Sequence, residues 1–241
     1  MSTIKTLGCK AVTFYDAAME KIKYLDFSVP LAFRLILAPV LIVAGYHKLQ
    51  LPNLGSEGVS FFQALMPDPN VVEWFGNSDW GLGMPLPELM AFMAGWTEFI
   101  GGWLLLFGLA ARFVSIPLAG TMLVAALTAH LGNGWFAIAP SNPDTSAAQV
   151  YSWLGFDMAD ESLKNSEEVS TRLSAARSLL SKHGNNRWLT EKGSFVVLNN
   201  GIEFAITYLF MLLTVFFMGG GRFVSIDYWL NCWIRKQAGP Q

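Results

Sequence analysis

Two glutamates lie inside the most apolar stretches of the sequence. Glu98 and Glu203 are each followed by phenylalanine, and each pair leads through an apolar run to the same pentapeptide, Arg-Phe-Val-Ser-Ile, at 112–116 and at 222–226. An acid inside a membrane helix costs roughly 2.5–3.5 kcal/mol on insertion scales, so it is a candidate for proton exchange or ligand binding. Its repetition predicts a duplicated helical hairpin with a polar centre.

Other polar side chains share these stretches. Arg34 and Lys48 are spaced i and i+14, which puts both cations on one face of a helix. Asn199 and Glu203 are spaced i and i+4, with Asn200 adjacent. A polar stripe on a membrane helix must face protein or water. The alternative for each cation is a side chain that reaches the lipid headgroups, and for the asparagines a hydrogen bond between helices.

Glu98 lies near the middle of its apolar stretch. At 1.5 Å per residue it is roughly 15 Å from either membrane boundary, which is too deep for its carboxylate to reach water. It should therefore be protonated or paired with a cation. Arg34 is the partner that we expect, although it lies about two helical turns nearer the cytoplasmic boundary.

His130 ends the third apolar stretch. An imidazole can hydrogen-bond a quinone carbonyl, relay protons or bind a metal. No ligand spacing such as HxxxH accompanies it, so we predict no metal site, and a structural histidine is the alternative. The catalytic candidates are Arg34, Glu98 and Glu203. The predicted binding site comprises Arg34, Lys48, Glu98, His130, Asn199, Asn200 and Glu203.

The composition is that of a membrane protein. Of 241 residues, 53% are apolar and 14% are charged, against about 25% charged in average soluble proteins. The formal net charge of −2 gives no basic surface for nucleic acid. The sequence has no GxGxxG, P-loop, GxSxG, haem or iron–sulfur motif, so we predict no intrinsic cofactor.

Four stretches are long and apolar enough to cross a bilayer, which takes about 20 residues. They predict an all-α integral membrane four-helix bundle, built as two tandem helical hairpins. The transmembrane domain would cover 29–218, and its helices would run over 29–49, 89–111, 113–131 and 195–218.

The distribution of lysine and arginine predicts the orientation. The loop 50–87 contains acids but no Lys or Arg, whereas 1–28 carries four lysines and the tail 219–241 carries three basic residues. The positive-inside rule puts both termini in the cytoplasm, with the spans in a bacterial inner membrane. The insert 132–194 then forms a periplasmic cap.

Two segments outside the spans are predicted to be helical. In 1–28, apolar residues at 14, 18, 22 and 25 recur at helical spacing with lysines on other faces, which predicts an interfacial helix on the membrane surface. In the cap, 167–183 predicts a helix with the apolar stripe Val169, Leu173, Ala176 and Leu180.

The order and spacing of residues in the spans resemble the DoxX family of small four-helix membrane proteins of bacteria. The resemblance rests on Arg34, on Gly45-x-x-Lys48, and on the stretch from Glu98 through Gly101-Gly102 to Gly108-Leu109 and Arg112. The segments 132–135 and 183–204 resemble a longer subgroup, which is associated with maturation of ribosomally made, copper-binding peptides.

The resemblance implies a function. Some DoxX proteins are described as the membrane subunit of a thiosulfate:quinone oxidoreductase. By that similarity Arg34, Glu98 and Lys48 would line a site for a quinone or another small acceptor. The long outer insert departs from that pattern and leaves the electron donor open.

We interpret the chain as a subunit of a quinone-dependent oxidoreductase. Glu98 or Glu203 would exchange its proton with a quinone that enters from the lipid, Arg34 would stabilise negative charge, and a partner protein or substrate would supply electrons.

A non-catalytic anchor for a peptide-modifying complex is an alternative, in which Trp188 and the helix 167–183 dock a partner. A small exporter is another. A homodimer would enlarge the site and is compatible with the sequence.

Overall fold

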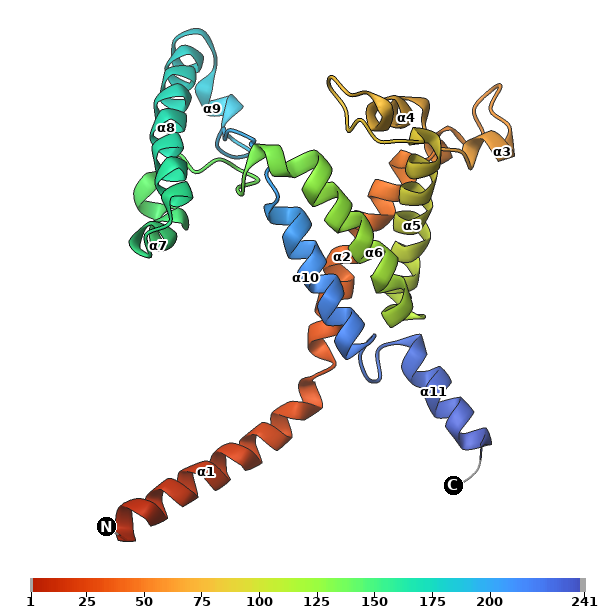
Figure 1. Ribbon diagram of the computed structural model, residues 1–241, viewed down its shortest axis with the longest axis vertical. Coiled ribbons are helices and arrows are strands. Elements are labelled where there is room, and N and C mark those ends of the chain that lie inside the picture. The colour runs from red at the N-terminus through yellow and green to blue at the C-terminus, as the bar shows by residue number, and fades with distance from the viewer. Residues whose placement is uncertain (1, 239–241) are drawn as a thin grey trace. The chain divides into compact units, whose positions relative to one another are not determined.

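The computed structural model describes the backbone of residues 2–238 and the side chains of residues 12–238 (Figure 1). This part of the chain is helical and contains isolated backbone bridges but no strand, which confirms the all-α class. It forms two compact units: the first holds the residues up to Ala125 and those from Ile206, and the second holds Ala126–Ala205. The helices are α1 (Ser2–Ile22), α2 (Ser28–Lys48), α3 (Phe61–Ala64), α4 (Pro69–Gly76), α5 (Pro87–Phe107), α6 (Ala111–Ala125), α7 (Ala148–Trp153), α8 (Asp157–His183), α9 (Asn186–Leu189), α10 (Glu203–Met218) and α11 (Ile226–Gln237).

Three helical stretches of the described chain are long and apolar enough to cross a membrane: Val12–Lys48, Pro87–Phe107 and Ala111–Asn133. They correspond to the first three predicted spans, although α5 ends at Phe107 rather than 111. The fourth predicted span, 195–218, is shorter than expected, because α10 has 16 residues and so extends about 24 Å at 1.5 Å per residue.

Residues 195–202 are not helical because they pair with another segment of the second unit. Leu198 forms a backbone bridge with Ile138, and the Gly201 amide donates to the Phe136 carbonyl at 3.0 Å. A Cβ at position 201 would lie 2.5–2.6 Å from three carbonyl oxygens of that segment. Glycine lets the two backbones approach, and the helix starts only after this contact.

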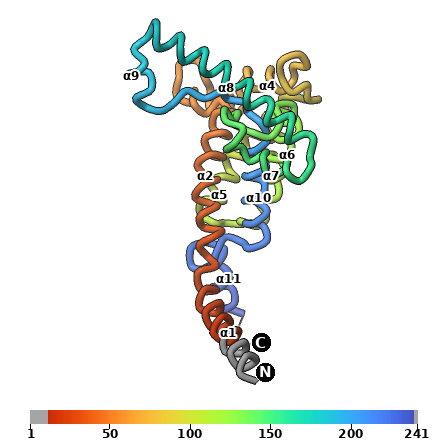
Figure 2. Tube along the Cα trace, turned by 90° about the vertical axis from the view of Figure 1, so that its left-hand side faces the viewer, coloured from red at the N-terminus to blue at the C-terminus, as the bar shows by residue number. Residues whose placement is uncertain are grey.

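Small residues bring α2 and α5 into contact, and the two helices lie side by side (Figures 1 and 2). A Cβ on Gly45 would overlap the backbone of Phe99, and one on Gly102 would lie 2.7 Å from Cγ1 of Ile42. Close approach of this kind is how membrane helices gain packing energy, since lipid supplies no hydrophobic driving force between them.

The core of the first unit contains residues from four helices. Its most buried members are at most 1% exposed, so α10 packs with the other three helices although it is short. These residues are Leu37 and Leu41 of α2, Leu105 of α5, Ala111 and Leu118 of α6, and Leu212 and Val215 of α10.

The repeated pentapeptide has two different structures, so the equivalence that it predicted is wrong locally. The copy at 112–116 lies in α6, whereas 222–224 form a turn and Ser225 caps α11 by accepting a hydrogen bond from the Tyr228 amide. Gly219 and Gly221 have φ of +81° and +93°. These left-handed conformations, which favour glycine, turn the chain before the second copy.

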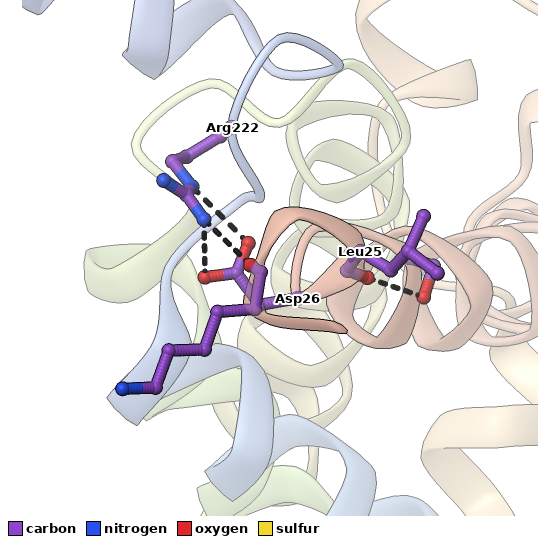
Figure 3. A network of polar contacts seen from close by, with 5 residues as sticks. Leu25, Asp26 and Arg222 are labelled. Atoms are coloured by element: carbon purple, nitrogen blue, oxygen red, sulfur yellow. Dashed lines mark hydrogen bonds and ion pairs between the residues drawn. The ribbon is translucent and has the colours of Figure 1, made fainter. Parts of the chain in front are cut away.

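The predicted tail 219–241 contains α11, and the segment before this helix is bound to the start of α2. The Arg222 guanidinium pairs with both carboxylate oxygens of Asp26, at 3.1 and 2.7 Å, and also donates to the Lys23 carbonyl at 2.8 Å (Figure 3). The junction of α1 with α2 is thereby linked to the chain that leaves α10.

In the second unit, α8 is longer than predicted at its N-terminal end. It starts at Asp157 rather than 167, because Asp157 and Asp160 in the first turn complement the helix dipole. Its end at His183 is as predicted. Val169 and Leu173 of the predicted stripe are buried, whereas Ala176 is exposed.

The packing of α2 on α5 predicts that Gly45→Ala destabilises the protein, because the new methyl group would meet backbone atoms that cannot rotate away. Overpacking of this kind costs about 1–3 kcal/mol. The matched control is Gly120→Ala in α6, where an added Cβ meets no atom within 4 Å. Thermal unfolding in detergent should show a lower midpoint for Gly45→Ala alone. Equal midpoints for both variants would contradict the close packing.

Candidate functional site

The central polar contact of the first unit is an ion pair between α2 and α5. The Lys48 ammonium, on the last residue of α2, binds Oε2 of Glu98. The Glu98 side chain is 5% exposed and that of Lys48 is 24% exposed. The expectation that Arg34 would pair with Glu98 is therefore wrong. The antiparallel packing of α2 and α5 puts Lys48 opposite Glu98, whereas Arg34 lies opposite the end of α5.

Small residues around this pair let α2 and α5 approach closely enough for the two side chains to meet. A Cβ on Gly95 would lie 2.9 Å from the side chain of Leu49, the residue after Lys48, so a larger residue there would displace Leu49. Aromatic rings flank the pair on both helices: Phe99 lies 6.2 Å from Tyr46 and 6.1 Å from Trp96, between ring centroids. In such apolar surroundings the attraction between the two charges is stronger than in water.

The chain after α2 folds back over the end that carries Lys48. The Gln50 amide donates to the Met66 carbonyl and the Asp68 amide donates to the Lys48 carbonyl, both at 2.9 Å. Asp68 then caps α4 by accepting a hydrogen bond from the Asn70 amide. The loop 50–87 is therefore fixed to the end of α2.

A groove of about 720 Å³ lies beside this fold-back, between α4 and α5. A drug-sized molecule fits such a volume. Its lining is mainly apolar, with two carboxylates. The lining includes Met66, Val72, Leu89, Phe92, Glu73 and Glu88.

Arg34 is 1% exposed and uses its guanidinium on backbone carbonyls. It donates to Leu105 and Leu106 at 2.6 Å, to Gly220 at 2.5 Å and to Val224 at 3.3 Å. The first two carbonyls belong to the last turn of α5, where helix carbonyls lack intrahelical partners and the dipole favours a cation. Arg34 therefore joins α2, α5 and the chain before α11.

Asp227 is a residue that no sequence motif had marked, and it is the counterpart of Arg34 at the next helix end. Its carboxylate accepts hydrogen bonds from the amides of Ala110 and Ala111 at 2.7 and 2.8 Å, where α6 starts. Gly108, with φ +64°, forms the turn between α5 and α6, and a Cβ there would lie 2.7 Å from the guanidinium carbon of Arg34. In the sequence, the feature that could have pointed to Asp227 is its position directly after the second pentapeptide.

The other predicted site residues lie together in the second unit. Nδ1 of His130 lies 2.8 Å from the Asn200 carbonyl, and the Asn199 side chain donates to the carbonyls of Asn133 and Phe136. Asn200 has φ +58°, the left-handed conformation that asparagine tolerates.

Glu203 belongs to this cluster. Its carboxylate accepts a hydrogen bond from the Ala137 amide at 3.0 Å, and its own amide donates to the Trp135 carbonyl at 3.0 Å. The structure thus brings Lys48 and Glu98 together in the first unit, and groups Glu203 with His130, Asn199 and Asn200 in the second. Among the described residues no group of three or more His, Cys, Asp or Glu side chains is arranged to hold a metal.

Comparison with known proteins assigns part of the chain. The DoxX family model matches residues 29–131. This stretch is a DoxX domain. Neither curated proteins nor solved structures give a match to the chain.

The DoxX domain covers α2, α5 and α6 and ends just after His130. It contains both members of the Lys48–Glu98 pair, and it contains Arg34. Asn199, Asn200, Glu203 and Asp227 lie beyond it. The apolar helices of the domain and its family assignment identify the chain as a membrane protein.

The buried ion pair predicts a strong coupling between its two side chains. Lys48→Met leaves the Glu98 carboxylate without its cation, and loss of one partner from a buried pair costs about 3–5 kcal/mol. Glu98→Leu alone leaves an ammonium that is partly exposed, so it should cost less. In the double variant, which buries no unpaired charge, stability should recover, giving a coupling energy of about 0.5–3 kcal/mol. Denaturant unfolding of the four proteins in detergent measures this cycle, and additive effects would exclude the pair.

Proposed function

We propose that the chain is a multi-pass protein of the bacterial inner membrane whose DoxX domain binds a quinone headgroup at Lys48 and Glu98. The observation that carries this proposal is a nearly buried carboxylate that shares an ion pair with a lysine still partly open to its surroundings. An ionisable pair inside membrane helices is by default a functional-site hypothesis, because it is costly to maintain.

The residues around the pair fit a quinone headgroup. An ammonium has three N–H donors, and Glu98 occupies one of them. The remaining donors can bind a carbonyl oxygen, while the rings of Tyr46 and Phe99 supply an apolar wall. The groove beside Met66 and Phe92 offers an apolar approach from the outer end of α5.

Each residue then has a distinct role in the proposal. A bound quinone would supply the redox chemistry by taking up two electrons and two protons. Lys48 would orient a carbonyl oxygen and its ammonium would donate a proton to that oxygen. The Glu98 carboxylate would take up a proton from water and return it to Lys48, and a second such transfer would supply the second proton. Electrons come from a partner protein that carries a redox centre. Arg34 and Glu203 serve the structure, because the first is bound to helix-end carbonyls and the second to the Ala137 amide.

The proposed topology has four spans, with α10 as the fourth. The length of α10 is about 6 Å short of the ~30 Å hydrocarbon core, and local thinning of the bilayer accommodates a mismatch of this size. Both termini then lie in the cytoplasm, and the second unit lies in the periplasm as a cap.

A non-catalytic scaffold is the second candidate, and the surface of the second unit favours it. Trp153 and Trp188 are 77% and 69% exposed. A groove of about 280 Å³ lies between α8 and residues 195–197, with Arg172 and Arg177 in its lining. An anchor for a peptide-modifying complex, as in the subgroup linked to copper-binding peptides, would use this surface and leave Lys48 and Glu98 dispensable.

Quinone binding is tested with the full-length protein in lipid nanodiscs, titrated with decylubiquinone by calorimetry. Lys48→Met should weaken binding about tenfold or more, since a hydrogen bond to a charged donor contributes about 1.5–3 kcal/mol. The matched control, Lys164→Met on the exposed surface of α8, should bind like the parent protein. Loss of folding is monitored by circular dichroism. If the parent protein shows no saturable binding, or if both variants match it, the quinone proposal fails and the scaffold remains.

The four-span topology is tested by cysteine labelling in whole cells. Single cysteines replace Asp79 in the loop after α2, Ser174 in α8 and Gln237 in α11, in a variant without other cysteines. A maleimide that does not cross membranes should label 79 and 174 in cells whose inner membrane is intact, and 237 only after lysis. Labelling of 174 and 237 under the same condition would show that α10 does not span.

A further inference from the structure

Helix α11 carries an apolar face that no other part of the described chain covers. Its apolar residues follow the spacing i, i+3, i+4, i+7 and i+8, which places them on one side of the helix. Each is between 40% and 60% exposed, and no residue of α11 is buried. They are Ile226, Trp229, Leu230, Trp233 and Ile234.

The start of α11 is fixed at one end of the membrane helices. The Asp227 carboxylate caps α6 at Ala110 and Ala111, and the Asp227 amide donates to the Gly108 carbonyl at 3.0 Å. Past Asp227, the described part of the chain shows no hydrogen bond from α11 to these helices. The stripe therefore begins at the level where α5 ends and α6 starts, which is a membrane boundary if these helices span.

The composition of α11 matches a lipid headgroup layer better than a protein surface. Trp229 and Trp233 are amphipathic rings of the kind that gather at membrane interfaces. Arg235 and Lys236 lie in the last turn of the helix. Cations beside an apolar stripe bind anionic headgroups, by about 1 kcal/mol for each Lys or Arg near the surface.

We propose that α11 is an interfacial helix, which lies along the membrane with its five apolar residues in the headgroup and acyl boundary and its cations on anionic lipid. This assigns a membrane-binding surface to a segment outside the DoxX domain and outside the proposed quinone site. The contacts of Asp227 link that surface to the turn between α5 and α6.

Spin labels on opposite faces of α11 test the proposal in the full-length protein. Leu230→Cys lies in the apolar stripe and Asn231→Cys is its matched control on the polar face, both in a variant with Cys9 and Cys232 changed to serine. In nanodiscs of phosphatidylcholine with phosphatidylglycerol, power saturation compares collisions with oxygen, which enriches in lipid, and with a water-soluble nickel chelate. Nanodiscs expose both faces, so the result does not depend on the orientation proposed above.

The proposal expects the oxygen-to-nickel ratio at 230 to exceed that at 231 several-fold. High nickel accessibility at both positions would place α11 in water and overturn the proposal. Protection of both positions from both reagents would indicate a protein partner or a second copy, and would also overturn it.

The role of anionic lipid is tested by changing Arg235 and Lys236 to glutamine. This change should remove the increase in the oxygen-to-nickel ratio at 230 that phosphatidylglycerol produces over phosphatidylcholine alone. A gain unchanged by these substitutions would overturn the role of anionic lipid.

Discussion

The contact between α2 and α5 decides which partners Arg34, Lys48 and Glu98 can reach. Lipid offers no partner to a polar side chain, so each one has to find its counterpart on a neighbouring helix. Gly45 and Gly102 let the two helices approach until backbone meets backbone. At that distance Lys48 reaches Glu98 near one end, and Arg34 reaches the last carbonyls of α5 near the other.

The charged side chains at the two ends of this helix pair are neutralised in different ways. Near the end of α2, two full charges neutralise each other in apolar surroundings. At the end of α5, Arg34 faces the partial negative charge of helix carbonyls, and Asp227 faces the partial positive charge of the amides that start α6. The Lys48–Glu98 pair leaves two ionisable side chains that can exchange protons or bind a ligand. The hydrogen bonds of Arg34 and Asp227 instead stabilise the turn between α5 and α6. This difference is why the proposed function rests on Lys48 and Glu98.

The second unit shows how similar sequence features can serve another purpose. Glu203 follows the same Glu-Phe pattern as Glu98, yet its carboxylate binds a backbone amide of its own unit. Asn199 and His130 also bind backbone carbonyls there. These residues hold together the loop that precedes α10, and Gly201 lets that loop pack against the carbonyls of residues 134–136.

The sequence by itself determined the elements that depend on local composition. Apolar length predicted the three long apolar helices, and helical periodicity predicted the helix 167–183, which lies within α8. The tertiary structure decided what depends on contacts between distant residues. The register between α2 and α5 placed Lys48, and not Arg34, opposite Glu98. A charged side chain pairs with the group that lies at the same height along the neighbouring helix. Backbone pairing of Leu198 with Ile138 moved the start of α10 to Glu203. Gly219 and Gly221, both in left-handed conformations, turn the chain before the second copy of the pentapeptide, so the two copies differ in structure. Helical periodicity describes one element at a time, whereas a partner across a helix interface is set by packing that no single stretch of sequence encodes.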